Sequence, residues 1–244
     1  MIPIPYAKIN TLFLDVGNTL ITMDFAWVAE EFIAQGVRCD IQTLSRAEAA
    51  ARPIVSAGLE NRSTESKDAF NFYLETVLRC LPGGSDLEPS YIDNVSKELT
   101  PVLRPIGQAE RLWSSVIPGV PEALASLRKA GVKLAAVSNS DGTVEDVLIR
   151  QGLRSSLIAV YDSLKIGFEK PDPRIFFTAL KDLNADPSST MHVGDLYNID
   201  VKGARAAGLH CALIDPFGDW MDVDCERVKD LSELARKILG ARQA

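Results

Sequence analysis

The sequence contains few of the residues that bind soft metal ions or form disulfide bonds. Its 244 residues include 4 cysteines and 2 histidines. The cysteines are Cys39, Cys80, Cys211 and Cys225, and no two of them have the C-x-x-C spacing of a zinc site. Scattered thiols in a chain of this length are typical of proteins that stay reduced. We therefore expect neither a zinc site nor a disulfide framework, and we expect a cytoplasmic protein.

Basic residues are also scarce. The chain has 26 lysines and arginines against 33 aspartates and glutamates, which gives a formal net charge of −7. Because no surplus of cations exists to neutralise the phosphates of a polyanion, the composition argues against a nucleic acid as partner. A small anion could still bind through a local arrangement of donors.

Long apolar segments are missing as well. No uninterrupted apolar run approaches the length of a membrane span. The first ten residues, MIPIPYAKIN, lack the basic start and the apolar stretch of a signal peptide. We expect no association with a membrane, and by default a monomer or a homodimer.

Short apolar runs alternate with helical patterns in most of the chain. Five runs have the length and composition of buried strands, at residues 11–16, 132–138, 157–161, 190–194 and 210–214. Apolar residues follow the i, i+3, i+4 spacing of a helix at 120–127, 175–183 and 228–238. Strands separated by helices predict βαβ units, so we expect an α/β fold with a Rossmann-like parallel sheet covered on both faces.

Residues 23–113 differ from the rest of the chain in the spacing of their apolar residues. Helical spacing occurs at 25–35, around 47–51 and at 70–81, without a convincing strand. Prolines and glycines at 82–84 and prolines at 101–105 indicate turns. We predict a helical cap of residues 23–113, inserted after the first strand into a core of residues 1–22 and 114–244.

Polar residues follow the predicted strands at the edge where ligands of parallel sheets bind. They are Asp15 after the first strand, Ser138 and Asn139 after the second, Lys170 downstream of the third, and Asp195 and Asp200 after the fourth. Taken singly, each has a simpler explanation as a turn residue, a helix N-cap or a surface lysine. Taken together, the three carboxylates would repel one another unless a cation lies between them, and oxygen ligands of this kind suit Mg²⁺. We therefore predict an Mg²⁺ site that includes Asp15 and Asp195, beside a pocket for an anionic group.

Four segments, in this order, resemble the four motifs of the haloacid dehalogenase-like (HAD) hydrolase superfamily: FLDVGNTL, VSNS, EKPDPRIF and HVGDLYNIDVKGARAAG. The predicted helical insertion is similar to the C1 cap of one large branch of that superfamily. The resemblance covers essentially the whole chain, and four ordered motifs are far more specific than any one of them.

The resemblance implies metal ligands and a nucleophile. Asp15 would form an aspartyl-phosphate and would also bind Mg²⁺ through its other oxygen. Asp195 and the main-chain carbonyl of Gly17 would be further ligands, and Asp200 would bind the metal directly or through water. Covalent catalysis by a carboxylate divides one difficult displacement into two easier ones.

The resemblance also implies residues that bind a small phosphorylated substrate. Ser138 and Asn139 would lie at the phosphoryl group, with Ser138 holding one of its oxygens. Lys170 would offset the charge of the nucleophile and the phosphate. Thr19 would brace the loop that carries the nucleophile.

The first motif departs from the family pattern at Gly17, where phosphohydrolases of the family have a second aspartate. Its carboxyl group serves there as the acid for the leaving group and then as the base for the attacking water. Gly17 keeps the main-chain carbonyl and lacks the carboxyl group. Acid–base catalysis by a positioned side chain contributes about 10²–10⁴-fold, so the metal site should survive while ester hydrolysis is altered.

Three interpretations follow from this departure. The first is a phosphohydrolase that depends on good leaving groups, which predicts faster cleavage of aryl or acyl phosphates than of alkyl phosphates, or on an acid supplied by the cap. The second is a relative that attacks carbon, either a 2-haloacid dehalogenase or a phosphonoacetaldehyde hydrolase that uses a cap lysine, for which only Lys67 and Lys97 are available. The third is a non-catalytic regulatory protein that binds Mg²⁺ and phosphate.

Overall fold

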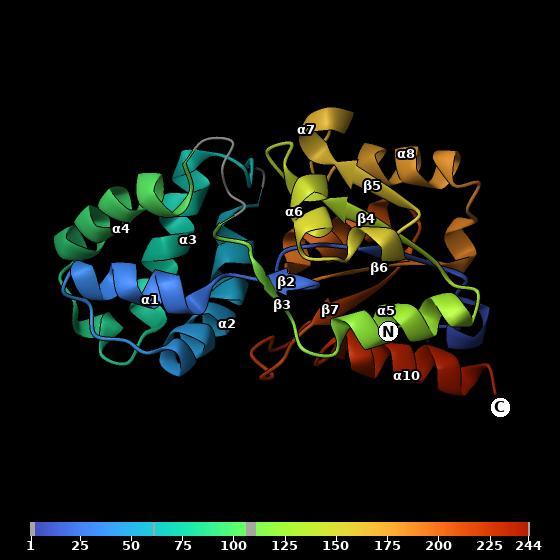
Figure 1. The fold of residues 1–244 in the computed structure, drawn as a ribbon, viewed down its shortest axis with the longest axis horizontal. Coiled ribbons are helices and arrows are strands. Elements are labelled where there is room, and N and C mark those ends of the chain that lie inside the picture. The colour runs from blue at the N-terminus through green and yellow to red at the C-terminus, as the bar shows by residue number, and fades with distance from the viewer. Residues whose placement is uncertain (1–2, 61, 106–110, 244) are drawn as a thin grey trace.

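The computed structural model describes residues 3–60, 62–105 and 111–243. Figure 1 shows two lobes, one built around a central sheet and one made of helices. The connection between them carries a short antiparallel strand pair, β2 (Ile21–Thr22) and β3 (Ser115–Val116). All four cysteines are free thiols.

The sheet has six parallel strands in the order β5-β4-β1-β6-β7-β8. They are β1 (Thr11–Leu14), β4 (Lys133–Ser138), β5 (Ala159–Asp162), β6 (Thr190–Gly194), β7 (His210–Ile214) and β8 (Glu226–Val228). Strand β1 lies at the centre, where Thr11 is opposite both Lys133 and Thr190. This order brings the carboxyl ends of β4, β1 and β6 next to one another, which is the edge where parallel sheets bind ligands.

Helices cover both faces of the sheet because successive residues of β1 point to opposite sides. Leu12 and Leu14 pack in one apolar cluster with residues of α5 (Val120–Lys129), α6 (Val144–Arg150) and α10 (Leu231–Ala241). Phe13 packs in a second cluster with residues of α8 (Arg174–Asp182) and α9 (Lys202–Ala206). A four-residue helix, α7 (Ser163–Ile166), follows β5, and a π-helical turn, η5 (Tyr197–Val201), precedes α9. The predicted α/β fold with a Rossmann-like parallel sheet is confirmed.

The helical lobe, which we call the helical insert, consists of α1 to α4 and their connections. The helices are α1 (Phe25–Ala34), α2 (Ile41–Gly58), α3 (Lys67–Cys80) and α4 (Pro89–Leu103). They share an apolar cluster of their own, and the partly buried Trp113 packs against both this cluster and the one around Leu12. Separate clusters are consistent with a division into a core of residues 1–22 and 114–244 and a cap of residues 23–113, which we retain as a proposal.

Two elements differ from the sequence prediction. Val228, expected in the last helix, lies in the edge strand β8, and the helix begins at Leu231 after the N-cap Asp230. Helix α4 continues through Pro101, where a turn was expected. Proline removes a helical hydrogen bond, but α4 buries Ile92, Val95, Leu99 and Leu103 along one face, and this packing outweighs the local preference.

Three short 3₁₀ turns complete the core, at Tyr6–Lys8, Arg154–Ser156 and Pro187–Ser189, and one lies in the insert at Gly84–Asp86. Within the described ranges, no helix is both long enough and apolar enough to span a bilayer.

Candidate active site

Asp15 stands directly after β1 and is 8% exposed. Lys170, on the loop before α8, donates from Nζ to Asp15 Oδ1 at 2.6 Å and to Asp200 Oδ1 at 2.7 Å. Burial raises the pKa of Asp15, and Lys170 opposes this rise. Burial alone would lower the pKa of Lys170, but the two carboxylates raise it above its ordinary value. Lys170 is therefore a cation that lies between two buried carboxylates.

Asp200 is held by hydrogen bonds on both of its carboxylate oxygens. Its Oδ1 lies 2.9 Å from His192 Nε2 in addition to its contact with Lys170, and its Oδ2 accepts from the Leu196 main chain at 2.9 Å. Burial would raise its pKa, but Lys170 and His192 together bring it below its ordinary value. Three of the four lone pairs of this carboxylate thus face protein donors. Asp200 thus helps to hold Lys170, and one lone pair is left for the predicted contact with a metal, directly or through water, which stays a prediction.

Asp195, which follows β6, is in contact with the helical insert. Its Oδ2 accepts from Asn18 Nδ2 at 3.1 Å and lies 3.6 Å from Arg52 Nε. The pKa of Asp195 is raised to about 8, mainly by burial; Arg52 opposes this rise, and the neighbouring Asp15, Asp200 and Glu48 add to it. Such a carboxylate is costly to keep ionised unless a cation is close to it.

Helix α2 supplies a buried network to this site. Glu48 is fully buried and pairs with Arg52 through Nη2 and Oε2 at 2.6 Å. Glu48 Oε1 also accepts from Asn18 Nδ2 and from the Tyr73 hydroxyl, each at 3.0 Å. Asn18 therefore joins the insert to Asp195, and its backbone has the left-handed φ of 52° that asparagine tolerates better than most residues.

Gly17 faces Trp113 rather than a catalytic side chain. A Cβ atom built on Gly17 would lie 3.5 Å from Trp113 Cζ3 and 3.6 Å from Cη2, which is ordinary van der Waals contact. The indole thus borders the place where the family's second carboxylate would start.

The predicted substrate-binding residues divide into two groups. Ser138 and Lys170 are buried and line the cavity, where Ser138 donates only to the Asn139 carbonyl, at 3.2 Å. Asn139 also lines it, but its amide is engaged by Lys170 N at 2.7 Å, the Lys170 carbonyl at 2.9 Å and Thr64 Oγ1 at 2.9 Å. Thr19 is buried outside the cavity lining, and its hydroxyl has no hydrogen-bond partner in the part of the chain that the structure describes. Asn139 thus lies at the cavity with its side chain held by Lys170 and Thr64, whereas Thr19 lies beneath the cavity wall, and the roles expected of both stay predictions.

The loop between α2 and α3 closes the cavity from the insert side. Ser63 Oγ donates to Glu169 Oε1 at 2.8 Å, and Thr64 N donates to Glu169 Oε2 at 3.1 Å. The next residue, Glu65, projects into the cavity and pairs with Arg104. Neither Lys67 nor Lys97 lines the cavity, which disfavours a Schiff-base lysine.

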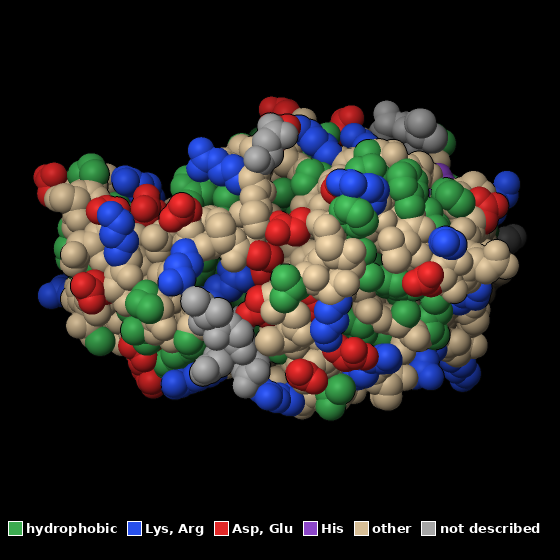
Figure 2. All heavy atoms as spheres, turned by 90° about the horizontal axis from the view of Figure 1, so that it is seen from above, with side chains coloured by type: hydrophobic (Ala, Val, Ile, Leu, Met, Phe, Trp, Pro, Cys, Tyr) green, Lys and Arg blue, Asp and Glu red, His purple; other side chains and the backbone are tan. Residues whose placement is uncertain are grey.

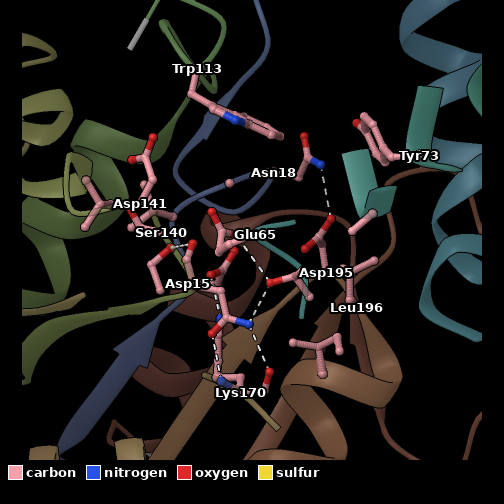
Figure 3. A pocket seen from close by; sticks show the side chains of 18 of the residues that line it. Asp15, Asn18, Glu65, Tyr73, Trp113, Ser140, Asp141, Lys170, Asp195 and Leu196 are labelled. Atoms are coloured by element: carbon pink, nitrogen blue, oxygen red, sulfur yellow. Dashed lines mark hydrogen bonds and ion pairs between the residues drawn. The ribbon is translucent and has the colours of Figure 1, made fainter. Parts of the chain in front are cut away.

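The cavity lies between the two lobes and encloses about 1050 Å³, part of it open to solvent. Figure 2 shows acidic side chains around the hollow between the lobes. Figure 3 shows Asp15, Lys170 and Asp195 on the core side, with Glu65, Tyr73 and Trp113 around the same space. Apolar side chains form most of the insert wall: Val55, Leu59, Ala69 and Phe70.

The donors around Asp15 and Asp195 could hold a hard divalent cation. Across the described residues, no group of three or more His, Cys, Asp or Glu side chains gathers as a metal cage. Magnesium does not require such a cage, since one or two carboxylates with waters and substrate phosphate are enough. Asp195 Oδ1 accepts no hydrogen bond from the described residues. Asp15 Oδ1 accepts one from Lys170 and keeps a second lone pair, and both residues line the cavity with Gly17.

The charges of the site agree with this assignment. Asp15, Asp195, Asp200 and Glu48 bring four buried carboxylates, against the cations of Lys170 and Arg52. With all four carboxylates ionised, they exceed these two cations by two negative charges. A divalent cation would balance that excess.

Sequence reasoning missed the residues that the insert supplies. Glu48, Arg52 and Tyr73 are distant in sequence from every motif, and Glu48 stands in an alanine-rich helix that shows no sign of a site. Asn18 and His192, in contrast, belong to the motifs themselves, so the sequence carried a signal for them.

Comparisons with known proteins identify the family. A family model for haloacid dehalogenase-like hydrolases matches residues 9–208. A haloacid dehalogenase-like hydrolase domain-containing protein 3 from Bos taurus is 46% identical over 99 residues, which are 41% of this chain and 39% of that protein. A glyceraldehyde 3-phosphate phosphatase from Methanopyrus kandleri is 32% identical over 132 residues, 50% of this chain and 57% of that one. The chain thus spans well under half the length of the bovine relative.

Solved structures share the fold at low identity. A HAD-hydrolase from Bacillus subtilis bound to magnesium has a TM-score of 0.63 at 18% identity, over 94% of this chain and 98% of that one. A HAD phosphatase from Thermococcus onnurineus has a TM-score of 0.60 at 21% identity, over 97% of this chain and 100% of that one. Together with the family match over most of the chain, the fold and the strand-end residues show that this protein belongs to the haloacid dehalogenase-like hydrolase family.

Proposed function

We propose that the protein is an Mg²⁺-dependent phosphohydrolase that forms an aspartyl-phosphate on Asp15. The observation that carries this proposal is the arrangement of Asp15 between Lys170 and the open cavity. Lys170 holds Oδ1 at 2.6 Å, while Oδ2 accepts no hydrogen bond from the described residues. One carboxylate oxygen is thus fixed and the other is available for attack.

The residues around Asp15 suit a phosphoryl group. Lys170 uses two of its three N–H donors on Asp15 and Asp200, so the third is available for a phosphoryl oxygen. Ser138 places a hydroxyl on the same cavity wall. Phosphoryl transfer depends mainly on positioning and on charge stabilisation, which a buried lysine and a hydroxyl donor provide.

Asp15, Asp195 and the Gly17 carbonyl would hold Mg²⁺. When bound, the cation would neutralise charge on the transferring phosphoryl oxygens. Asn18 and Arg52 would keep Asp195 oriented from its other oxygen. The magnesium-bound Bacillus subtilis relative supports this assignment by analogy of fold.

The insert would act as the cap that excludes water and selects the substrate. Its wall is mainly apolar, which favours a small phosphorylated molecule with an apolar part near Phe70 and Trp113. The relatives named as phosphatases act on small phosphorylated molecules such as glyceraldehyde 3-phosphate, which supports the substrate class without fixing the substrate.

Acetyl phosphate and 4-nitrophenyl phosphate test this proposal, because neither leaving group needs a strong acid. We expect Mg²⁺-dependent release of phosphate by the wild type and a loss of roughly 10³-fold or more in Asp15→Asn. Asp146→Asn on the exposed face of α6 is the matched control and should keep full activity.

Other outcomes would support the alternatives. Halide release from a 2-haloacid without Mg²⁺ would indicate a dehalogenase. Thermal stabilisation by Mg²⁺ and phosphate without turnover would indicate a binding protein. Either result, with no phosphate release, would contradict the phosphohydrolase proposal.

A further inference from the structure

The site lacks an evident proton donor for the leaving group. Gly17 has no side chain, and the ring of Trp113 lies beside it. The carboxylates of Asp15 and Asp200 are committed to Lys170, and Asp195 to Asn18 and Arg52. An ester substrate would therefore need an acid from another part of the cavity.

The geometry of displacement indicates where that acid must stand. Attacking and leaving oxygens lie roughly in line on opposite sides of the phosphorus. Since Asp15 attacks from the edge of the sheet, the leaving oxygen points towards the helical insert. Three ionisable side chains of the described insert line the cavity: Glu65, Tyr73 and Arg104.

Only one of these three side chains suits acid–base catalysis. An arginine does not lose its proton in proteins. The Tyr73 hydroxyl already donates to Glu48, and burial with the neighbouring Glu48 raises its pKa well above 10. Glu65 is a carboxyl group whose pKa is raised by burial, lowered by Arg104, and raised by Glu169 and Asp141.

The position of Glu65 is fixed by contacts between the insert and the core. Thr64 Oγ1 lies 3.3 Å from Glu65 Oε1 and accepts from Asn139 Nδ2 at 2.9 Å. Asn139 in turn accepts from the main chain of Lys170 at 2.7 Å. This chain of hydrogen bonds connects Glu65 to the loop that holds the nucleophile, while Arg104 holds Oε2. Figure 3 shows Glu65 and Asp15 in the same part of the cavity.

We propose that Glu65, oriented by Arg104, is the acid and base that replaces the carboxyl group missing at Gly17. The proposal rests on the phosphohydrolase function above. In the first step, Asp15 Oδ2 forms a bond to phosphorus, the bond from phosphorus to the leaving oxygen breaks, and Glu65 gives that oxygen its proton. In the second step, the Glu65 carboxylate takes a proton from water, the water oxygen bonds to phosphorus, and the bond to Asp15 breaks. Glu65 is then protonated again, and Asp15 is regenerated.

The test compares two substrates in the wild type and in Glu65→Gln. Glycerol phosphate leaves as an alkoxide that needs a proton, whereas acetyl phosphate leaves as a stable carboxylate. We expect the ratio of kcat/KM for acetyl phosphate to kcat/KM for glycerol phosphate to rise by about 10²-fold or more in Glu65→Gln. Phosphorylated protein should also accumulate with acetyl phosphate, since the second step lacks its base. Intact-mass spectrometry after acid quenching measures this accumulation.

Matched variants separate a catalytic role from a structural one. Glu98→Gln, on the exposed face of α4, should leave both substrates unaffected. Glu65→Asp, which keeps the carboxyl group, should recover part of the glycerol phosphate activity. Equal losses on the two substrates in Glu65→Gln would overturn the role of Glu65, as would a selective loss in Asp141→Asn instead.

The experiment distinguishes a failure of the phosphohydrolase proposal from a failure of the role of Glu65. If the wild type releases no phosphate from either substrate, the phosphohydrolase proposal fails and the role of Glu65 falls with it. If the wild type cleaves acetyl phosphate through Asp15 but not glycerol phosphate, the function stands and Glu65 is not the acid.

Discussion

The two walls of the cavity are built in different ways. The core wall carries Asp15 and Asp195 at adjacent strand ends and Lys170 on the loop before α8, and hydrogen bonds join these buried charges to their neighbours. The insert wall is largely apolar, and the ion pair of Glu65 with Arg104 borders the cavity there. The core wall thus has the features needed to stabilise charge, and the insert wall has those needed to bind the rest of a substrate and to move a proton.

This difference has an energetic basis. Removing one partner from a buried ion pair costs much more than removing one at the surface, because the remaining charge stays out of water. Side chains of the core wall are at most 11% exposed in the Lys170 cluster, against 15% and 21% for Arg104 and Glu65. Variants on the two walls should therefore differ in how strongly they affect stability.

The largest effect is expected for Lys170→Gln. It leaves Asp15 and Asp200 buried without their cation, so the free energy of unfolding should fall by about 3–5 kcal/mol. Phosphate release should be lost as well. Urea denaturation measures the change in stability, with Lys165→Gln on the exposed face of α7 as control. A loss below about 1 kcal/mol would mean that the core wall does not depend on this charge.

Alanine substitutions at Gly194 and Gly17 compare how tightly these two positions are packed. A Cβ on Gly194 would lie 2.1 Å from Asp200 Cγ, whereas one on Gly17 would meet Trp113 at 3.5 Å. Gly194→Ala must displace Asp200 and should cost about 1–3 kcal/mol. Gly17→Ala should change the free energy of unfolding by about 0.5 kcal/mol or less. Thermal unfolding of both variants tests this order, and equal losses would contradict the packing described for the core wall.

The ion pair between Glu65 and Arg104 in the insert wall predicts how kcat/KM depends on pH. Arg104 lowers the pKa of Glu65, which burial holds above its ordinary value of 4.5. As an acid, Glu65 acts only while protonated, so kcat/KM for glycerol phosphate should fall as pH rises through its pKa. In Arg104→Gln the pKa rises, and this descending limb should move to higher pH. A limb that stays in place, or moves to lower pH, would argue against Glu65 as the acid.

The smallest effect is expected where the two walls meet. Glu169→Gln weakens the contacts to Ser63 Oγ and Thr64 N, at 2.8 and 3.1 Å. Each such bond contributes about 0.5–1.5 kcal/mol, so KM should rise modestly with little change in global stability. A double-mutant cycle with Ser63→Ala measures the coupling. Fully additive effects would show that this contact does not hold the loop over the site.

The sequence indicated more of the core wall than of the insert wall. Asp15 and Asp195 could be predicted to lie near each other because parallel strands bring their carboxyl ends to one edge of the sheet. A local pattern does not show that His192 and Lys170 lie against the oxygens of Asp200, whose role as a metal ligand stays a prediction. Glu65 and Arg104 could not be found, since they meet only when α3 and α4 pack.

The edge strand β8 and the hydrogen bonds of Asn139 also depend on contacts that are distant in sequence. The short strand β8 was assigned to a helix because Val228 continues the apolar spacing of the helix that follows. For Asn139 the motif gives its place in the sequence but not its hydrogen bonds to Thr64 and Lys170. Tertiary contacts determine both features.

The most direct test of the account is to look for a phosphoryl group on Asp15. Wild-type protein is mixed with acetyl phosphate and Mg²⁺, quenched in acid and analysed by mass spectrometry of its peptides. We predict one phosphoryl group on the peptide that contains Asp15, an increased amount in Glu65→Gln, and none in Asp15→Asn. Release of phosphate by Asp15→Asn at the wild-type rate, or a phosphoryl group on another peptide, would contradict the central claim that Asp15 is the nucleophile.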